Sequence, residues 1–275
     1  MRIALCNEVL GEMPFSRQCD FAARLGYDGL EVAPYTLADD PTSITPFAAR
    51  EFCKMARDAG IAITGLHWLL LKPKELSITA ADEAVRAKTI DVIRFLVTLC
   101  AELGGRYLVH GSPAQRRIGR DPEAAKRAVE CWAAAGEAAR AAGVVYCIEP
   151  LASPEADFVH TVQDAAAIVE NIGNPHLRTM LDCCAAARME AEPVAAVLDR
   201  WLPTGLIGHI QVNDRNRRGP GQGSDAFAPV FDALVRNDWQ GDVAVEPFDY
   251  EPDGPACAAR AIGYIRGLLE ALEMR

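Results

Sequence analysis

The sequence predicts a single domain, residues 1–275, folded as an α/β (β/α)8 barrel, or TIM barrel. Short apolar runs alternate with longer amphipathic runs from one end of the chain to the other. Half of the residues are apolar, so the chain is long enough for one large core. No GxGxxG or GxxxxGK[ST] motif follows a strand-like run, which disfavours the alternative, an open doubly wound sheet.

Each expected strand is a short apolar run, usually entered through a Gly, Ala or Asn turn. The strands are expected near 2–6, 28–33, 61–66, 105–110, 144–149, 178–182, 205–211 and 242–246. Helical periodicity fills the gaps near 15–25, 46–59, 81–103, 121–142, 161–172, 190–200, 224–237 and 255–273. This strict alternation implies a parallel sheet with right-handed crossovers, which closes naturally into a barrel.

Composition narrows the class of partner. The formal net charge of -10 opposes nucleic acid or an anionic membrane as the partner and favours a small-molecule substrate. The nine cysteines form no CxxC pair, so we expect reduced core residues in a cytoplasmic protein. No segment approaches the ~18 consecutive apolar residues of a membrane span, and no signal-peptide pattern opens the chain.

Four polar residues, Glu149, Asp182, Gln211 and Glu246, lie at or just beyond the ends of the last four expected strands. In a (β/α)8 barrel these strand ends meet at one mouth. Three carboxylates and one amide oxygen are ligands that suit Mg²⁺ or Mn²⁺. The sequence therefore predicts a site for one divalent metal ion, Mn²⁺ or Mg²⁺ in the first place and Co²⁺ as a further option.

Glu149 and Glu246 share a local pattern, because each ends an apolar strand and is followed by proline. Strands five and eight lie across the mouth from one another, so the two carboxylates can flank a substrate from opposite faces. A divalent ion bound to vicinal oxygens of a ketose acidifies the adjacent C–H, and one glutamate then removes a proton that the other returns. The predicted reaction is epimerisation or aldose–ketose isomerisation.

These motifs resemble the xylose-isomerase-like barrel of sugar isomerases and epimerases, especially its ketose 3-epimerase and hydroxypyruvate isomerase branches. The resemblance covers nearly the whole chain, and its specific part is Ile148-Glu149-Pro150, Leu181-Asp182, Gly208-His209-Ile210-Gln211, Asn216-Arg217, Pro220-Gly221-Gln222-Gly223 and Val245-Glu246-Pro247. It implies that the four strand-end residues bind one divalent ion and that the two glutamates act as acid and base. The position of Gln211 is His in the epimerases and Gln in the hydroxypyruvate isomerases. Oligomers are common among relatives, so a homo-oligomer is expected.

The resemblance also implies substrate contacts by Glu155 and Arg217. One departure concerns Ala185, because relatives usually place a substrate-binding histidine three residues after the metal aspartate. His67 and His110, after strands three and four, are the candidate replacements. Basic residues after strands three, four and seven would favour an anionic sugar acid, keto acid or sugar phosphate, and they are Lys72, Lys74, Arg116, Arg117, Arg120, Arg215, Arg217 and Arg218.

Three alternative functions remain open at this stage. A dehydratase acting on an inosose-like or keto-sugar substrate would use the same metal and carboxylates. An abasic-site endonuclease shares the barrel but binds three zinc ions through many histidines, which the five histidines and the charge of -10 oppose. A non-catalytic partner subunit is suggested only by Ala185 and is opposed by the intact Glu149 and Glu246.

Overall fold

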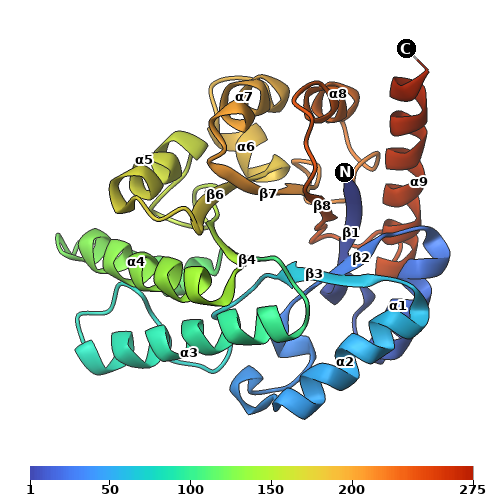
Figure 1. The fold of residues 1–275 in the computed structure, drawn as a ribbon. Helices are drawn as coiled ribbons and strands as arrows, with labels where there is room; N and C mark the ends of the chain where they lie inside the picture. The colour runs from blue at the N-terminus through green and yellow to red at the C-terminus, as the bar shows by residue number, and fades with distance from the viewer. Residues whose placement is uncertain (275) are drawn as a thin grey trace.

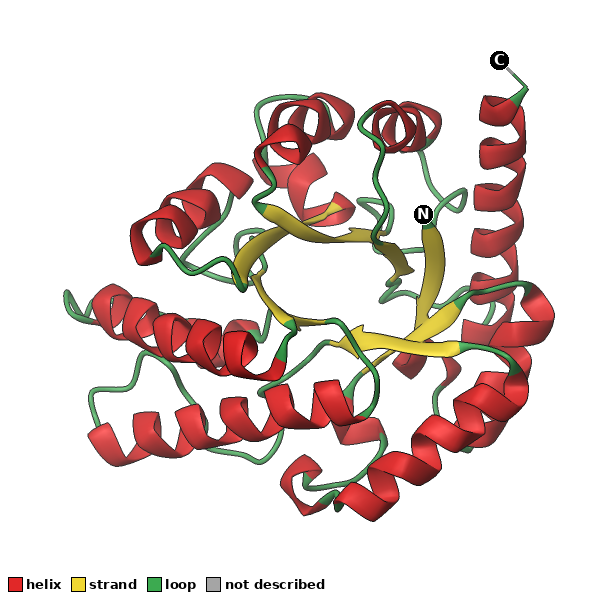
Figure 2. Ribbon diagram, viewed as in Figure 1, coloured by secondary structure: helices red, strands yellow, loops and turns green. Residues whose placement is uncertain are grey.

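The computed structural model describes residues 1–274, and its strands form a closed parallel barrel in chain order. Viewed along the barrel axis, the strands form a central ring with the helices around the outside (Figures 1 and 2). β8 pairs with β1, so no strand edge is left open. The strands are β1 (Arg2–Cys6), β2 (Gly29–Val32), β3 (Ala62–Leu66), β4 (Tyr107–His110), β5 (Val145–Ile148), β6 (Leu177–Asp182), β7 (Ile207–Val212) and β8 (Asp242–Val245). The barrel prediction is confirmed, and the open doubly wound sheet is excluded.

The helices follow the predicted order with small shifts at their ends. They are α1 (Phe15–Leu25), α2 (Pro46–Ala59), α3 (Glu83–Glu102), α4 (Ala124–Ala142), α5 (Val162–Ile172), α6 (Cys183–Met189), α7 (Val194–Trp201), α8 (Ala228–Arg236) and α9 (Gly254–Glu273). Short 3-10 helices are η1 (Asn7–Leu10), η2 (Pro34–Thr36), η3 (Pro41–Ser43), η4 (Pro113–Arg116) and η5 (Leu202–Thr204). The main difference is α6, which the sequence did not predict.

Helix α6 begins directly at the end of β6 because Asp182 caps it. The carboxylate Oδ1 of Asp182 accepts a hydrogen bond from the backbone N–H of Ala185 at 2.7 Å. The helix ends at Met189, the backbone of Glu190 is extended, and Pro193 then precedes α7. A helix of seven residues is too short to show clear apolar periodicity, so pattern reasoning assigned only the second helix in this interval.

The interior of the barrel holds both apolar and polar side chains. A small hydrophobic cluster consists of Tyr107, Val109, Cys147 and Met180, from β4, β5 and β6. Gln211 in β7 donates through Nε2 to Glu31 in β2 at 2.8 Å. β2 and β7 are not neighbours in the barrel, so both polar side chains must point into its interior.

All nine cysteines are free, and all but the partly buried Cys53 are buried, as expected for core residues. Within residues 1–274, the structure has no helix with the length and apolar character needed to cross a membrane. Location in the cytoplasm and assembly into a homo-oligomer stay predictions.

Candidate metal and substrate site

Three carboxylates converge at the carboxyl ends of the strands. Glu149, Asp182 and Glu246 each offer an oxygen within 4.8 Å of the others, and their exposed fractions are only 8%, 5% and 4%. Gln211 is fully buried and lies opposite Asp182 in the β6–β7 register. The four residues predicted as metal ligands therefore come from consecutive strands at one side of the barrel mouth.

These residues fit a divalent cation, because three of the four have a buried oxygen without a partner in the described structure. Asp182 Oδ2, Gln211 Oε1 and Glu246 Oε2 are buried and accept no hydrogen bond. Buried polar atoms without a partner carry a large desolvation cost, so such a cluster requires compensation. Carboxylate and amide oxygens are hard ligands of the kind that Mg²⁺ and Mn²⁺ prefer.

The electrostatics of the three carboxyl groups also favour a bound cation. Burial, and then the charge of Asp182, raise the pKa of Glu149 well above its ordinary value. Burial and Glu149 do the same to the pKa of Glu246, and burial raises the pKa of Asp182 to about 6. Like charges in a desolvated site oppose one another's ionisation, and a divalent cation would remove that opposition.

Glu149 is positioned by the segment that follows β4. The guanidinium of Arg116 is fully buried and donates to the carbonyl oxygen of Glu149 at 2.6 Å. On the same segment, a Cβ added to Gly111 would lie 2.1 Å from Glu149 Oε2, so only glycine permits this close approach. Sequence reasoning grouped Arg116 with basic loop residues and missed this structural role.

A cavity of about 130 Å³ opens beside the carboxylates. It is lined by His67, Trp68, Gly111, Ser112, Pro113, Glu149, Leu151, Glu155, Arg217, Glu246 and Phe248. Trp68 and Phe248 meet edge to face at 6.3 Å, and the Arg217 guanidinium lies over the Phe248 ring at 5.0 Å. Trp68, Ser112 and Arg217 have positive φ angles of 50°, 40° and 70°. Because such strained residues cluster at functional sites, this cavity is the candidate substrate pocket.

His67, predicted as a substrate contact, lines this pocket and lies among carboxylates. Its Nε2 lies 2.8 Å from Glu8 Oε2 and 3.9 Å from Glu246 Oε1. Burial alone would lower the pKa of His67, but the neighbouring Glu8 and Glu31 carboxylates raise it. Cys6, Glu8, His67 and Glu246 also offer ligand atoms within 4.8 Å of one another. Glu8 follows β1 in η1, and no motif in the sequence pointed to it.

His110, the other predicted replacement donor, does not line the pocket. Its Nδ1 accepts hydrogen bonds from Trp132 Nε1 at 3.1 Å and from Tyr146 Oη at 2.8 Å, which places the ring proton on Nε2. Burial and Arg116 lower the pKa of His110 to about 3. The ring is therefore neutral and held within the core, and a substrate contact by His110 stays a prediction.

A polar side chain from the same helix lines the small cavity beside Ala185. Arg188, three residues further along α6, donates through Nη1 to Glu155 Oε1 at 3.0 Å. Arg217 donates to the same oxygen at 3.3 Å. These residues line a second, smaller cavity together with Glu149 and Ala185. Glu155 and Arg217 thus line the pocket, and their contact with substrate stays a prediction. Arg188 is a further polar group that sequence reasoning missed.

Half of the eight predicted basic residues are paired with acids. Lys72, Arg215 and Arg218 form ion pairs with Asp39, Asp225 and Asp249. Arg217, which pairs with Glu155, is the member of the group that lines the pocket. The described structure therefore does not concentrate this positive charge at the pocket, which weakens the argument for an anionic substrate.

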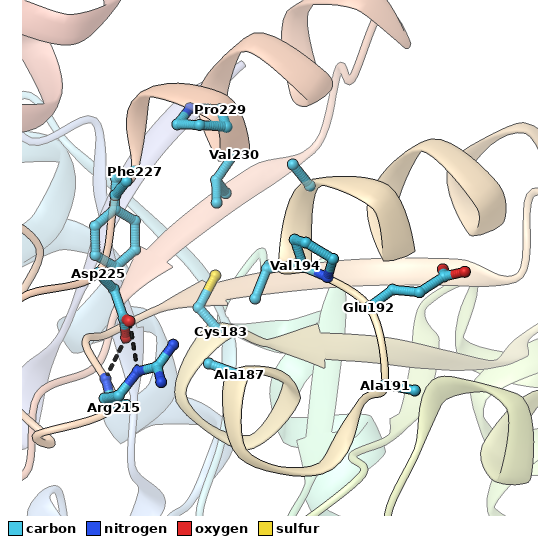
Figure 3. Close-up of a pocket in the computed structure, with 13 residues that line it drawn as sticks. Cys183, Ala187, Ala191, Glu192, Val194, Arg215, Asp225, Phe227, Pro229 and Val230 are labelled. Carbon is cyan, nitrogen blue, oxygen red and sulfur yellow. Dashed lines mark hydrogen bonds and ion pairs between the residues drawn. The ribbon is translucent and has the colours of Figure 1, made fainter.

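Figure 3 shows another cavity, of about 450 Å³, outside the barrel mouth. Cys183, Phe227 and Val230 give it apolar walls, and Arg215 and Asp225 are paired at one side. Among the residues that the structure describes, neither candidate metal-binding group lies there. We therefore assign the site to the smaller cavity at the barrel mouth.

Residues 19–268 match the family model described as the xylose isomerase-like TIM barrel. The chain belongs to this family. Among curated members and relatives, L-ribulose 3-epimerase of Mesorhizobium japonicum is 28% identical over 185 residues. That match covers 65% of this chain and 60% of the relative, so the chain matches less than two thirds of the relative's length. D-psicose 3-epimerase of Enterocloster bolteae is 27% identical, over 85% of this chain and 77% of the relative.

Two solved structures share the barrel fold of this chain. The structure of L-ribulose 3-epimerase aligns with a TM-score of 0.84 at 23% identity, covering 99% of this chain and 96% of that chain. The structure of 3-keto-D-glucoside 4-epimerase from E. coli aligns with a TM-score of 0.82 at 19% identity, covering 97% of this chain and 99% of that chain. At these identities the likeness shows the barrel fold alone.

Proposed function

We propose that this chain is a divalent-metal-dependent epimerase or isomerase of a ketose, keto acid or sugar phosphate. Glu149, Asp182, Gln211 and Glu246 hold the ion, and the two glutamates transfer the proton. The observation that carries the proposal is the buried cluster of carboxylates, with unpartnered oxygens, beside the pocket at the barrel mouth. The curated relatives, named as sugar epimerases, support an enzyme of this type.

When bound, the ion polarises a substrate carbonyl and so acidifies the C–H next to it. Glu149 and Glu246 come from β5 and β8, so they approach a substrate between them from different sides. One takes the proton and the other delivers a proton to the opposite face, which inverts that carbon, whereas delivery to the neighbouring carbon isomerises the sugar. Phe248 and Trp68 form the apolar wall of the pocket, while Arg217 and Glu155 at its rim contact substrate hydroxyl groups.

The alternatives have weaker support. The comparisons give the dehydratase no support, although it would use the same carboxylates. The complete set of four ligands opposes a non-catalytic subunit. The chain charge of -10 opposes an endonuclease.

Proton exchange tests the proposal. The protein, loaded with Mn²⁺, is incubated in D₂O with D-psicose, L-ribulose and other ketoses, and NMR follows deuterium at carbon. We expect exchange that EDTA abolishes and that Glu149→Gln and Glu246→Gln each reduce by at least about 10²-fold. The matched control is Glu137→Gln, an exposed glutamate on α4 that should leave exchange unchanged. Full exchange in both active-site variants would refute the two-base mechanism, and release of an ultraviolet-absorbing enone would establish the dehydratase instead.

A further inference from the structure

Glu31, which the mechanism above does not use, is a fully buried carboxylate inside the barrel. Tyr107 Oη donates to its Oε2 at 2.7 Å, and His209 Nε2 lies 2.7 Å from the same oxygen. Its Oε1 accepts from Gln211 Nε2 at 2.8 Å and from Cys6 Sγ at 3.7 Å. Both oxygens of the Glu31 side chain therefore accept hydrogen bonds from the surrounding donors.

This contact determines which end of the Gln211 amide faces the metal site. An amide has one donating end, Nε2, and one accepting end, Oε1. Because Nε2 is held by Glu31, Oε1 is the other branch of the amide, and it is buried without a partner on a residue that pairs with Asp182 in the β6–β7 register. The reversed amide would place its oxygen 2.8 Å from the Glu31 oxygen, so that two acceptors would face one another. The reversed amide would also point its Nε2 N–H groups at the position proposed for the cation.

We infer that Glu31 is a positioning residue for the metal site: by accepting the Gln211 N–H, it presents Gln211 Oε1 to the cation. This inference rests on the metal site of the proposed function. Residues that hydrogen-bond to a metal ligand commonly change metal affinity by about 10–100-fold. The dependence is specific to an amide ligand, because a carboxylate at position 211 has two equivalent oxygens and needs no orientation.

Mn²⁺ titrations by calorimetry, without substrate, test the inference. The effect of changing Glu31 is compared in the wild-type protein and in the Gln211→Glu variant. Glu31→Ala should weaken Mn²⁺ binding by about 10–100-fold, because the amide is then free to reverse. In the Gln211→Glu background the same change should strengthen binding, since it removes a carboxylate 2.8 Å from the new one. The double variant keeps the wild-type number of carboxylates, so its affinity should approach that of wild type.

A merely structural role for Glu31 predicts a different pattern, in which its removal weakens binding in both backgrounds. That pattern, or unchanged Mn²⁺ affinity in a folded Glu31→Ala protein, would overturn the inference. Glu31→Leu fills more of the vacated volume and takes the place of alanine if the alanine variant does not fold, with the same expected results. If the wild-type protein binds no Mn²⁺, the proposed metal site itself is refuted.

The matched control is Asp242→Ala. Asp242 is also a buried carboxylate, but it lies at the start of β8, at the opposite end of the barrel, where Arg2 and Arg106 pair with it. Its removal should lower the unfolding temperature and leave the Mn²⁺ dissociation constant unchanged. Circular dichroism of each variant separates loss of fold from loss of affinity.

Discussion

Replacing Gly111 with alanine should disable the site by displacing one carboxylate. The new Cβ would lie 2.1 Å from Glu149 Oε2 and 3.2 Å from its Cδ, whereas real Cβ contacts are essentially never under 3.0 Å. The carboxylate must therefore move by about 1 Å, and displacements of that size cost about 10²-fold in rate at well-oriented sites. Gly111 is not among the residues with positive φ, so alanine itself fits the backbone.

Arg116 holds the backbone carbonyl of Glu149 at 2.6 Å, so the displacement falls on the side chain and its carboxylate. We therefore expect the deuterium exchange rate of Gly111→Ala to fall by about 10²-fold and its Mn²⁺ affinity to fall as well. Gly263→Ala is the control, because nothing lies within 4 Å of a Cβ at that position on α9. Wild-type exchange and wild-type Mn²⁺ affinity in Gly111→Ala would show that the close approach to Glu149 has no functional importance.

Three further predictions concern stability and substrate binding. In EDTA, the raised carboxyl pKa values, about 6 for Asp182, mean that the folded chain binds these protons more tightly than the unfolded chain. The unfolding temperature measured by calorimetry should therefore fall as the pH rises from about 4, the carboxyl pKa of the unfolded chain, through about 6. Mn²⁺ should restore the unfolding temperature at neutral pH. Equal unfolding temperatures with and without Mn²⁺ would contradict this prediction. Arg116→Met leaves several buried carbonyl groups without their hydrogen-bond donor. It should lower the free energy of unfolding in urea by about 3 kcal/mol or more. Arg94→Met, at an exposed position, should lower it by less than about 0.5 kcal/mol. Arg188→Ala releases Glu155 and should raise KM about tenfold with Mn²⁺ affinity unchanged; an unchanged KM would remove Arg188 from the pocket's functional groups.

The sequence predicted the barrel and the position of the carboxylate cluster because both depend on local pattern. Each strand is a short apolar run, and the barrel rule that strand ends meet at one mouth then brings Glu149, Asp182 and Glu246 together. Gln211 was expected at the end of its strand and lies within β7, with its side chain inside the barrel.

The residues that sequence reasoning missed act through long-range contacts. Glu31 stands in the middle of a short strand, and its role depends on Tyr107, His209 and Gln211, which are distant in the chain. Arg188 lies on the unpredicted helix α6, so no pattern suggested that it reaches Glu155. Pairings of this kind follow from how strands and helices are arranged in space, and a single sequence carries no local signal for them.

The two halves of the barrel contribute unequally to the metal site. The strands β5 to β8 supply all four proposed ligands, while Glu31 comes from β2. A half-barrel made of β5 to β8 would therefore carry the full set of ligand residues and still lack the acceptor that orients Gln211. Separately produced halves would regain an oriented amide only on reassociation, so cation affinity would report whether the two halves had joined correctly.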